Sequence, residues 1–90
     1  MVRARICLDT TRQVKEFCEA MNSDGTINRY VVENVDGTYR INARSYLGMI
    51  AASADFGDYM YLINETEDGV FPSFVDKFRY LGDDGEFIHE

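Results

Sequence analysis

In the stretch Ile41-Asn42-Ala43-Arg44-Ser45-Tyr46-Leu47-Gly48-Met49-Ile50, a strand pattern gives way to a helix pattern. The apolar residues from Tyr46 to Ile50 predict a helix of two to three turns. Ser45 stands at the expected N-cap, where a serine oxygen accepts a hydrogen bond from the first turn. Because the free N–H groups at a helix start favour negative charge, Ser45 is a cap, a phosphorylation site, or both.

Strand and helix patterns alternate along the rest of the chain. The predicted order is β-α-β-β-α-β-α, with strands over 2–8, 27–33, 38–42 and 59–64 and helices over 10–21, 45–54 and 71–81. Thr10 and Gln13 have the spacing of a capping box at the start of the first helix. Asp36-Gly37 between two strand patterns predicts a hairpin.

The order and apolar pattern of these elements predict an α+β fold. Residues 59–64 are apolar on both faces, so this strand is expected in the sheet interior. Helices in this proportion suggest an antiparallel sheet covered on one face. Residues 1–90 are expected to form a single domain, in which 83–90 is a frayed acidic tail.

The composition narrows the class of partner. A formal charge of -7, from 16 acidic and 9 basic residues, argues against nucleic acid or an anionic membrane and favours a basic protein. Arg3, Arg5 and Arg12 are close in sequence and could still form a local positive patch. Cys7 and Cys18 are expected to be reduced structural thiols, with no metal site. No membrane-length apolar run or signal-peptide core is present, so a cytoplasmic location is expected.

The segment Asn42-Ala43-Arg44-Ser45-Tyr46-Leu47-Gly48-Met49 resembles the region around the regulatory serine of HPr, the histidine-containing phosphocarrier family of the bacterial sugar phosphotransferase system. Gly57-Asp58 before the fourth strand, Asp68-Gly69 before the last helix, and the element order are also similar. The resemblance implies an HPr-like open-faced sandwich, in which a four-stranded antiparallel sheet carries three helices on one face.

The family's catalytic histidine is absent at the matching position. The histidine, small residue and arginine that open the family's first helix correspond here to Thr10, Thr11 and Arg12. A threonine would form a stable phosphate ester, unsuited to a shuttle, so Thr10 is expected to act as a cap and no catalytic residue is assigned. Arg12 either binds an anion or partner carboxylate or is solvated. His89 is expected to be solvated in the tail.

In the family, the position of Ser45 is phosphorylated by a dedicated kinase in many Gram-positive members. The resemblance also places Leu47 and Ile50 in an exposed apolar patch that several partners use. If Leu47 is exposed with Tyr46 and Met49 nearby, these residues form a binding site; otherwise they belong to the core.

The expected function is therefore that of a non-catalytic, regulatory HPr-like protein without enzyme activity or cofactor. It would bind a phosphotransferase component, a serine kinase or a transcription regulator. One alternative is a genuine phosphocarrier that uses a non-histidine site. Another is a ligand-sensing domain of ferredoxin-like topology. Enzyme activity through Asp36, Asp58 or Glu65 is disfavoured, because carboxylates in turns commonly bind the turn backbone.

Overall fold

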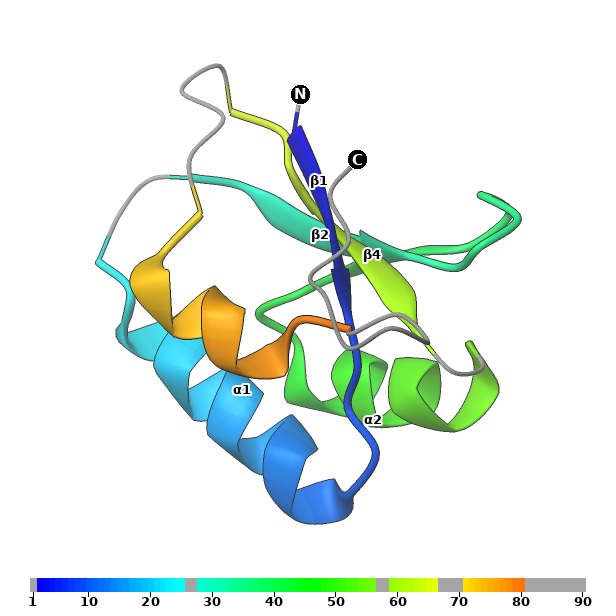
Figure 1. Ribbon diagram of the computed structural model, residues 1–90, viewed down its shortest axis with the longest axis horizontal. Helices are drawn as coiled ribbons and strands as arrows, with labels where there is room; N and C mark the ends of the chain where they lie inside the picture. The colour runs from blue at the N-terminus through cyan, green and yellow to red at the C-terminus, as the bar shows by residue number, and fades with distance from the viewer. Residues whose placement is uncertain (1, 26–27, 57–58, 67–70, 81–90) are drawn as a thin grey trace.

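The computed structural model describes residues 2–25, 28–56, 59–66 and 71–80 (Figure 1). Its elements are β1 (Val2–Ile6), α1 (Thr11–Ser23), β2 (Tyr30–Glu33), β3 (Arg40–Asn42), α2 (Tyr46–Asp55), β4 (Met60–Asn64) and the 3₁₀ helix η1 (Ser73–Phe78). The four strands form one sheet, and the helices lie on one of its faces (Figure 1). The predicted α+β class is therefore confirmed.

The sheet has the order β1-β4-β2-β3, and each neighbouring pair is antiparallel. Leu62 of β4 pairs with Ala4 of β1 on one side and Val32 of β2 on the other. All five residues of β4 are buried, which confirms its predicted interior position. The ferredoxin-like alternative also has an antiparallel sheet, but its split βαβ units place the first and third strands in the interior. In the described sheet β1 and β3 are the edge strands, so the strand order differs from that topology.

The core fills the space between the sheet and the helices. Alternate strand residues point to this side, including Ile6, Val32 and Leu62. From α1, the predicted apolar stripe Val14, Phe17, Cys18 and Met21 packs against them. Phe17 is fully buried and makes edge-to-face contacts with Phe74 and Phe78 of η1. Burial of these aromatic rings fixes η1 against α1.

The last helix differs from the prediction. An α-helix was expected over 71–81, whereas η1 is a 3₁₀ helix that ends at Phe78. The reason is that the chain then turns to the sheet: Cys7 N donates to Phe78 O at 2.8 Å, and Tyr80 N donates to Arg5 O at 2.9 Å. These bonds satisfy β1 backbone groups that an edge strand would otherwise expose. Leu81 and the predicted tail 83–90 lie outside the described residues.

All four strands are shorter than predicted, with β2 beginning at Tyr30 and β4 at Met60. β1 ends at Ile6, before the N-terminal cap region of α1. In the hairpin, Asn34 Oδ1 accepts from Thr38 N at 2.8 Å and from Tyr39 N at 3.1 Å, so β3 begins only at Arg40. Gly37 has a φ of 74°, a left-handed conformation that glycine adopts without strain. The predicted Asp-Gly hairpin is therefore confirmed, with a shorter second strand.

The other face of the sheet carries arginine and tyrosine side chains. Arg3 lies over the Tyr61 ring at 4.5 Å, and Arg5 lies over the Tyr59 ring at 4.9 Å. Arg12 lies on α1, which covers the opposite face. Arg12 therefore does not share a patch with Arg3 and Arg5, which was one of the possibilities that the sequence left open.

Candidate protein-binding surface of helix α2

Ser45 is the N-cap of α2, as predicted. Its Oγ accepts from Gly48 N at 3.2 Å, and its carbonyl oxygen accepts from Met49 N at 2.9 Å. The preceding turn is held by Asn42, whose Oδ1 accepts from Arg44 N at 2.9 Å and whose carbonyl oxygen accepts from Ser45 N at 3.0 Å. The Ser45 side chain is exposed and sits at the end of a helix where negative charge is stabilised.

Arg44 ties the start of α2 to the end of α1. Its guanidinium donates to the carbonyl oxygens of Met21 and Asn28 and pairs with the Asp24 carboxylate at 3.4 Å. It also lies 5.4 Å from the centre of the Tyr30 ring. A cation is favourable beside the carbonyl groups that end a helix. The local sequence pattern predicts no role for Arg44, because these partners are 16 to 23 residues away along the chain.

The inner face of α2 belongs to the core. Met49 and Ala52 are fully buried, and Gly48 lies against Ile41 of β3. Met49 is thus a core residue, which is one of the two alternatives that the sequence left open for it. A Cβ added at Gly48 would lie 2.5 Å from Ile41 Cγ2, so glycine permits the close approach of α2 to the sheet.

The outer face of α2 is apolar and exposed. Leu47 has 79% of its surface exposed, and Tyr46 and Ile50 are exposed as well. Successive residues are 100° apart around a helix, so the exposed Ala51 and Ala54 lie on the same side. We call these five residues, Tyr46, Leu47, Ile50, Ala51 and Ala54, the α2 patch. The exposure predicted for Leu47 and Ile50 is confirmed, whereas the two alanines were not anticipated.

The helix that carries the α2 patch has no charged residue from Ser45 to Ala54, and Asp55 is the first. Helices that are apolar all round are normally buried. A run of ten uncharged residues was the signal in the sequence that could have located the complete patch. Exposed apolar surface of this kind marks interaction sites in soluble proteins.

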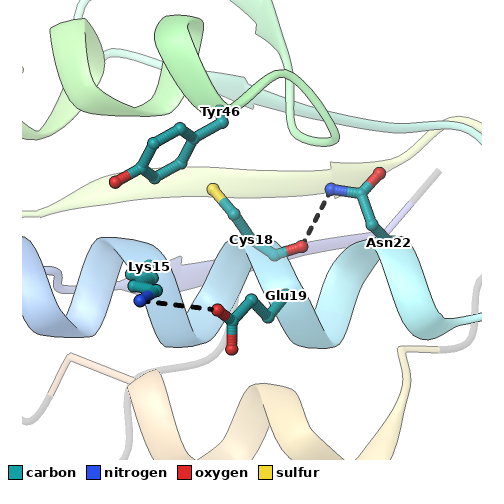
Figure 2. A pocket seen from close by; sticks show the side chains of 5 residues that line it. All are labelled: Lys15, Cys18, Glu19, Asn22 and Tyr46. Carbon is teal, nitrogen blue, oxygen red and sulfur yellow. Dashed lines mark hydrogen bonds and ion pairs between the residues drawn. The ribbon is translucent and has the colours of Figure 1, made fainter.

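A hollow of about 280 Å³ lies beside the α2 patch, between α1 and α2. Figure 2 shows Tyr46 reaching from α2 across it and the sulfur of Cys18 pointing toward α2 from α1. Cys18 is 3% exposed, and burial raises the pKa of its thiol. Lys15 and Glu19 line the α1 side of the hollow, and Lys15 Nζ lies 4.0 Å from Glu19 Oε1. The buried neutral thiol and the tyrosine ring give the hollow an apolar floor.

The start of α1 has a complete capping box, as predicted. Gln13 N donates to Thr10 Oγ1, and Thr10 N donates to Gln13 Oε1, both at 3.1 Å. The Arg12 guanidinium is 88% exposed and lies 3.1 Å from Glu16 on the next turn. It is therefore a solvated residue with an intrahelical partner, and Thr10 has the geometry of a cap.

Across the described ranges, no group of three or more His, Cys, Asp and Glu residues could hold a metal ion. None of the helices in these ranges is both long enough and apolar enough to cross a lipid bilayer. His89, like Asp58, the glycines at 57 and 69, and Asp68, lies outside the described residues. Comparisons of the chain with protein-family models, curated proteins and solved structures find no match.

Proposed function

We propose that this chain is a non-catalytic, HPr-like regulatory protein that binds another protein through the α2 patch. The observation that carries the proposal is the uncharged, exposed face of α2, which starts beside the exposed Ser45 hydroxyl. The open-faced antiparallel sheet with helices on one face supports an HPr-like fold. The candidate partners are a phosphotransferase component, a serine kinase and a transcription regulator.

The geometry at Thr10 supports a non-catalytic role. Its Oγ1 accepts from Gln13 N, so the hydroxyl position serves the helix cap. A phosphothreonine ester is also a poor phosphoryl donor. Incubation with phosphoenolpyruvate and the general phosphotransferase enzyme should therefore give no acid-labile phosphate on this protein. Incorporation at any residue would favour the alternative, a phosphocarrier with an unexpected site.

Ser45 suits a regulatory switch for electrostatic reasons. A phosphate there would add about -1.5 to -2 charges at the start of α2, where the helix dipole stabilises them. The same charge would lie next to Tyr46 and Leu47 of the α2 patch. Phosphorylation would thus alter the choice of partner more than the fold.

The test of this switch uses the serine kinase that acts on HPr. Ser45→Ala should abolish phosphate incorporation, whereas Ser53→Ala should not. Ser53 is a matched control because it lies in the same helix but bonds Ile50 O at 2.9 Å within the helix. Leu47→Glu should lower kcat/KM by about tenfold if the kinase contacts the α2 patch. Incorporation that persists in Ser45→Ala would reject Ser45 as the switch.

A further inference from the structure

The face of the sheet opposite the helices combines cations with aromatic rings. Arg3 and Arg5 lie 4.5 and 5.7 Å from the centre of the Tyr61 ring, and Arg5 lies 4.9 Å from the centre of the Tyr59 ring. The Tyr80 ring stacks on the Tyr59 ring at 4.8 Å. We call these five residues the arginine–tyrosine face. An arginine held over a ring still carries N–H donors with the geometry of a carboxylate, so this face suits an acidic ligand.

The same face is apolar at its centre, although no helix of the described ranges lies on it. Tyr61 is 7% exposed and Ile63 is 1% exposed, and both alternate along β4 with the core residues Met60 and Leu62. An antiparallel sheet that turns one face to water carries polar residues at such positions. The residue types of β4 are therefore those of a strand that is covered on both faces.

The chain reaches the edge of this face at Tyr80. Arg79 pairs with Ile6 in an antiparallel bridge, and Tyr80 N donates to Arg5 O at 2.9 Å (Figure 1). Because the bridge is antiparallel, the direction from Arg79 to Tyr80 runs along β1 toward Arg3. The sequence that follows Tyr80 therefore begins beside the two arginines.

Residues 81–90 have the chemistry that the face requires. They contain four acidic residues and neither lysine nor arginine, and Phe87 and Ile88 are adjacent apolar residues. The seven residues from Leu81 to Phe87 span up to about 24 Å when extended, whereas four neighbouring strands are about 14 Å across. The segment is thus long enough to reach every strand of the sheet.

We propose that residues 81–90 bind the arginine–tyrosine face of their own chain and act as its ligand. The carboxylates of residues 83–86 pair with Arg3 and Arg5, and Phe87 and Ile88 pack on the apolar centre of the face. A tethered segment has an effective concentration of about millimolar, so weak contacts are sufficient. An acidic peptide of another protein would reach this face only by displacing the segment. The proposal is independent of the proposed function, because the α2 patch lies on the helix side of the molecule.

A nitroxide label on His89→Cys, in a Cys7→Ser background of the full chain, tests the position of the segment. Cys18 is 3% exposed and should not take up the label. Broadening of the backbone amide NMR signals should be strongest at Arg3 and Tyr61. It should be weakest at Ile50, which is exposed on the helix side of the molecule. Uniform broadening, or broadening that is strongest on α2, would overturn the proposal.

The same label tests the charge pairing. An amide variant combines Asp83→Asn, Asp84→Asn and Glu86→Gln. It leaves every described residue unchanged, and it should reduce the broadening at Tyr61 by about threefold or more, because only the apolar contacts remain. Arg3→Glu should have the same effect, whereas Arg12→Glu, the same charge change at a side chain of α1 that is 88% exposed, should not. Unchanged broadening in both the amide variant and Arg3→Glu would exclude the pairing.

Titration with hexaglutamate at low ionic strength tests whether the segment competes with an acidic ligand. The peptide should bind the amide variant at least about threefold more tightly than the wild type, because the wild-type segment occupies the face. Adding Arg3→Glu to the amide variant should abolish this binding. Equal affinity for the two proteins, or no binding to the amide variant, would show that the segment does not occupy an acid-binding face.

Discussion

Helices α1 and α2 cover the same face of the sheet, and both begin with a side-chain cap, yet their outer faces differ in kind. On α1, Arg12 pairs with Glu16, and Lys15 lies near Glu19. On α2, the exposed face is apolar up to Asp55. Met49 and Ala52 already provide the contacts of α2 with the core. The requirements of folding therefore account for the residues on both faces of α1, whereas on α2 they account only for the residues on the inner face.

The largest expected effect on stability is the difference between truncating a core residue of α1 and truncating a residue of the α2 patch. Phe17→Ala removes a buried ring that contacts Phe74 and Phe78, and should lower the free energy of unfolding by about 3 to 5 kcal/mol. Leu47→Ala removes a side chain that is 79% exposed, and it should change the free energy of unfolding by less than about 0.5 kcal/mol. Urea denaturation monitored by circular dichroism measures both.

A large loss of stability in Leu47→Ala would contradict this difference between the two helices. It would mean that the outer face of α2 is required for folding of the single chain. Phe17→Leu provides a milder control, because it keeps an apolar side chain and should lose less stability than Phe17→Ala.

The second prediction concerns the inner face of α2. Alanine usually stabilises a helix relative to glycine, but a Cβ at Gly48 would lie 2.5 Å from the γ-methyl group of Ile41. Gly48→Ala should therefore lower the free energy of unfolding by about 1 to 3 kcal/mol. Gly25→Ala is the control, since nothing lies within 4 Å of the added Cβ, and it should be neutral.

Adding Ile41→Ala to Gly48→Ala tests whether the contact with Ile41 causes the loss of stability. Removal of the γ-methyl group makes room for the new Cβ, so the double variant should be more stable than the sum of the single losses predicts. Strict additivity would show that Gly48 is required for another reason.

The local patterns of the sequence predicted most of the fold, and the failures occurred where distant segments compete. Both helix caps and the hairpin depend on residues fewer than six positions apart, and each was predicted. The interior position of β4 followed from apolar residues on both faces. The shorter η1 could not be predicted, because it ends where Tyr80 bonds Arg5 at the sheet edge.

The same limit applies to the candidate site. Leu47 and Ile50 were expected in an exposed patch from a family resemblance, and Ser45 was predicted to be an N-cap from its place before the helix pattern. Periodicity did not separate Met49 from its apolar neighbours, since every residue of 46–50 other than Gly48 is large and apolar. Only the packing of α2 against Ile41 and the core decides which of them is buried. Arg44 was missed because its partners lie on α1 and the segment after it.

The third prediction compares the two caps. Thr10→Ala and Ser45→Ala should each lower the free energy of unfolding by about 1 kcal/mol, because each leaves a first-turn N–H without its side-chain acceptor. Thr10→Ser and Ser45→Asp keep an acceptor and should recover most of the loss. If Ser45→Ala has no effect in the same denaturation experiment, capping does not explain the serine, and a regulatory role gains weight.

The smallest expected effect is the pH dependence of stability that comes from Cys18, which lies between α1 and α2. Burial raises the pKa of its thiol, so the unfolded chain loses this proton at a lower pH than the folded chain. The contribution of Cys18 to stability is therefore complete below the pKa of the unfolded chain and is lost as pH rises through the folded pKa.

Wild type and Cys18→Ala should differ by a constant free energy of unfolding near neutral pH, and the difference should shrink in alkaline solution. All other titrating groups are common to both proteins and cancel in the difference. A difference that stays constant through the alkaline range would mean that the hollow between α1 and α2 admits enough water to solvate the thiolate.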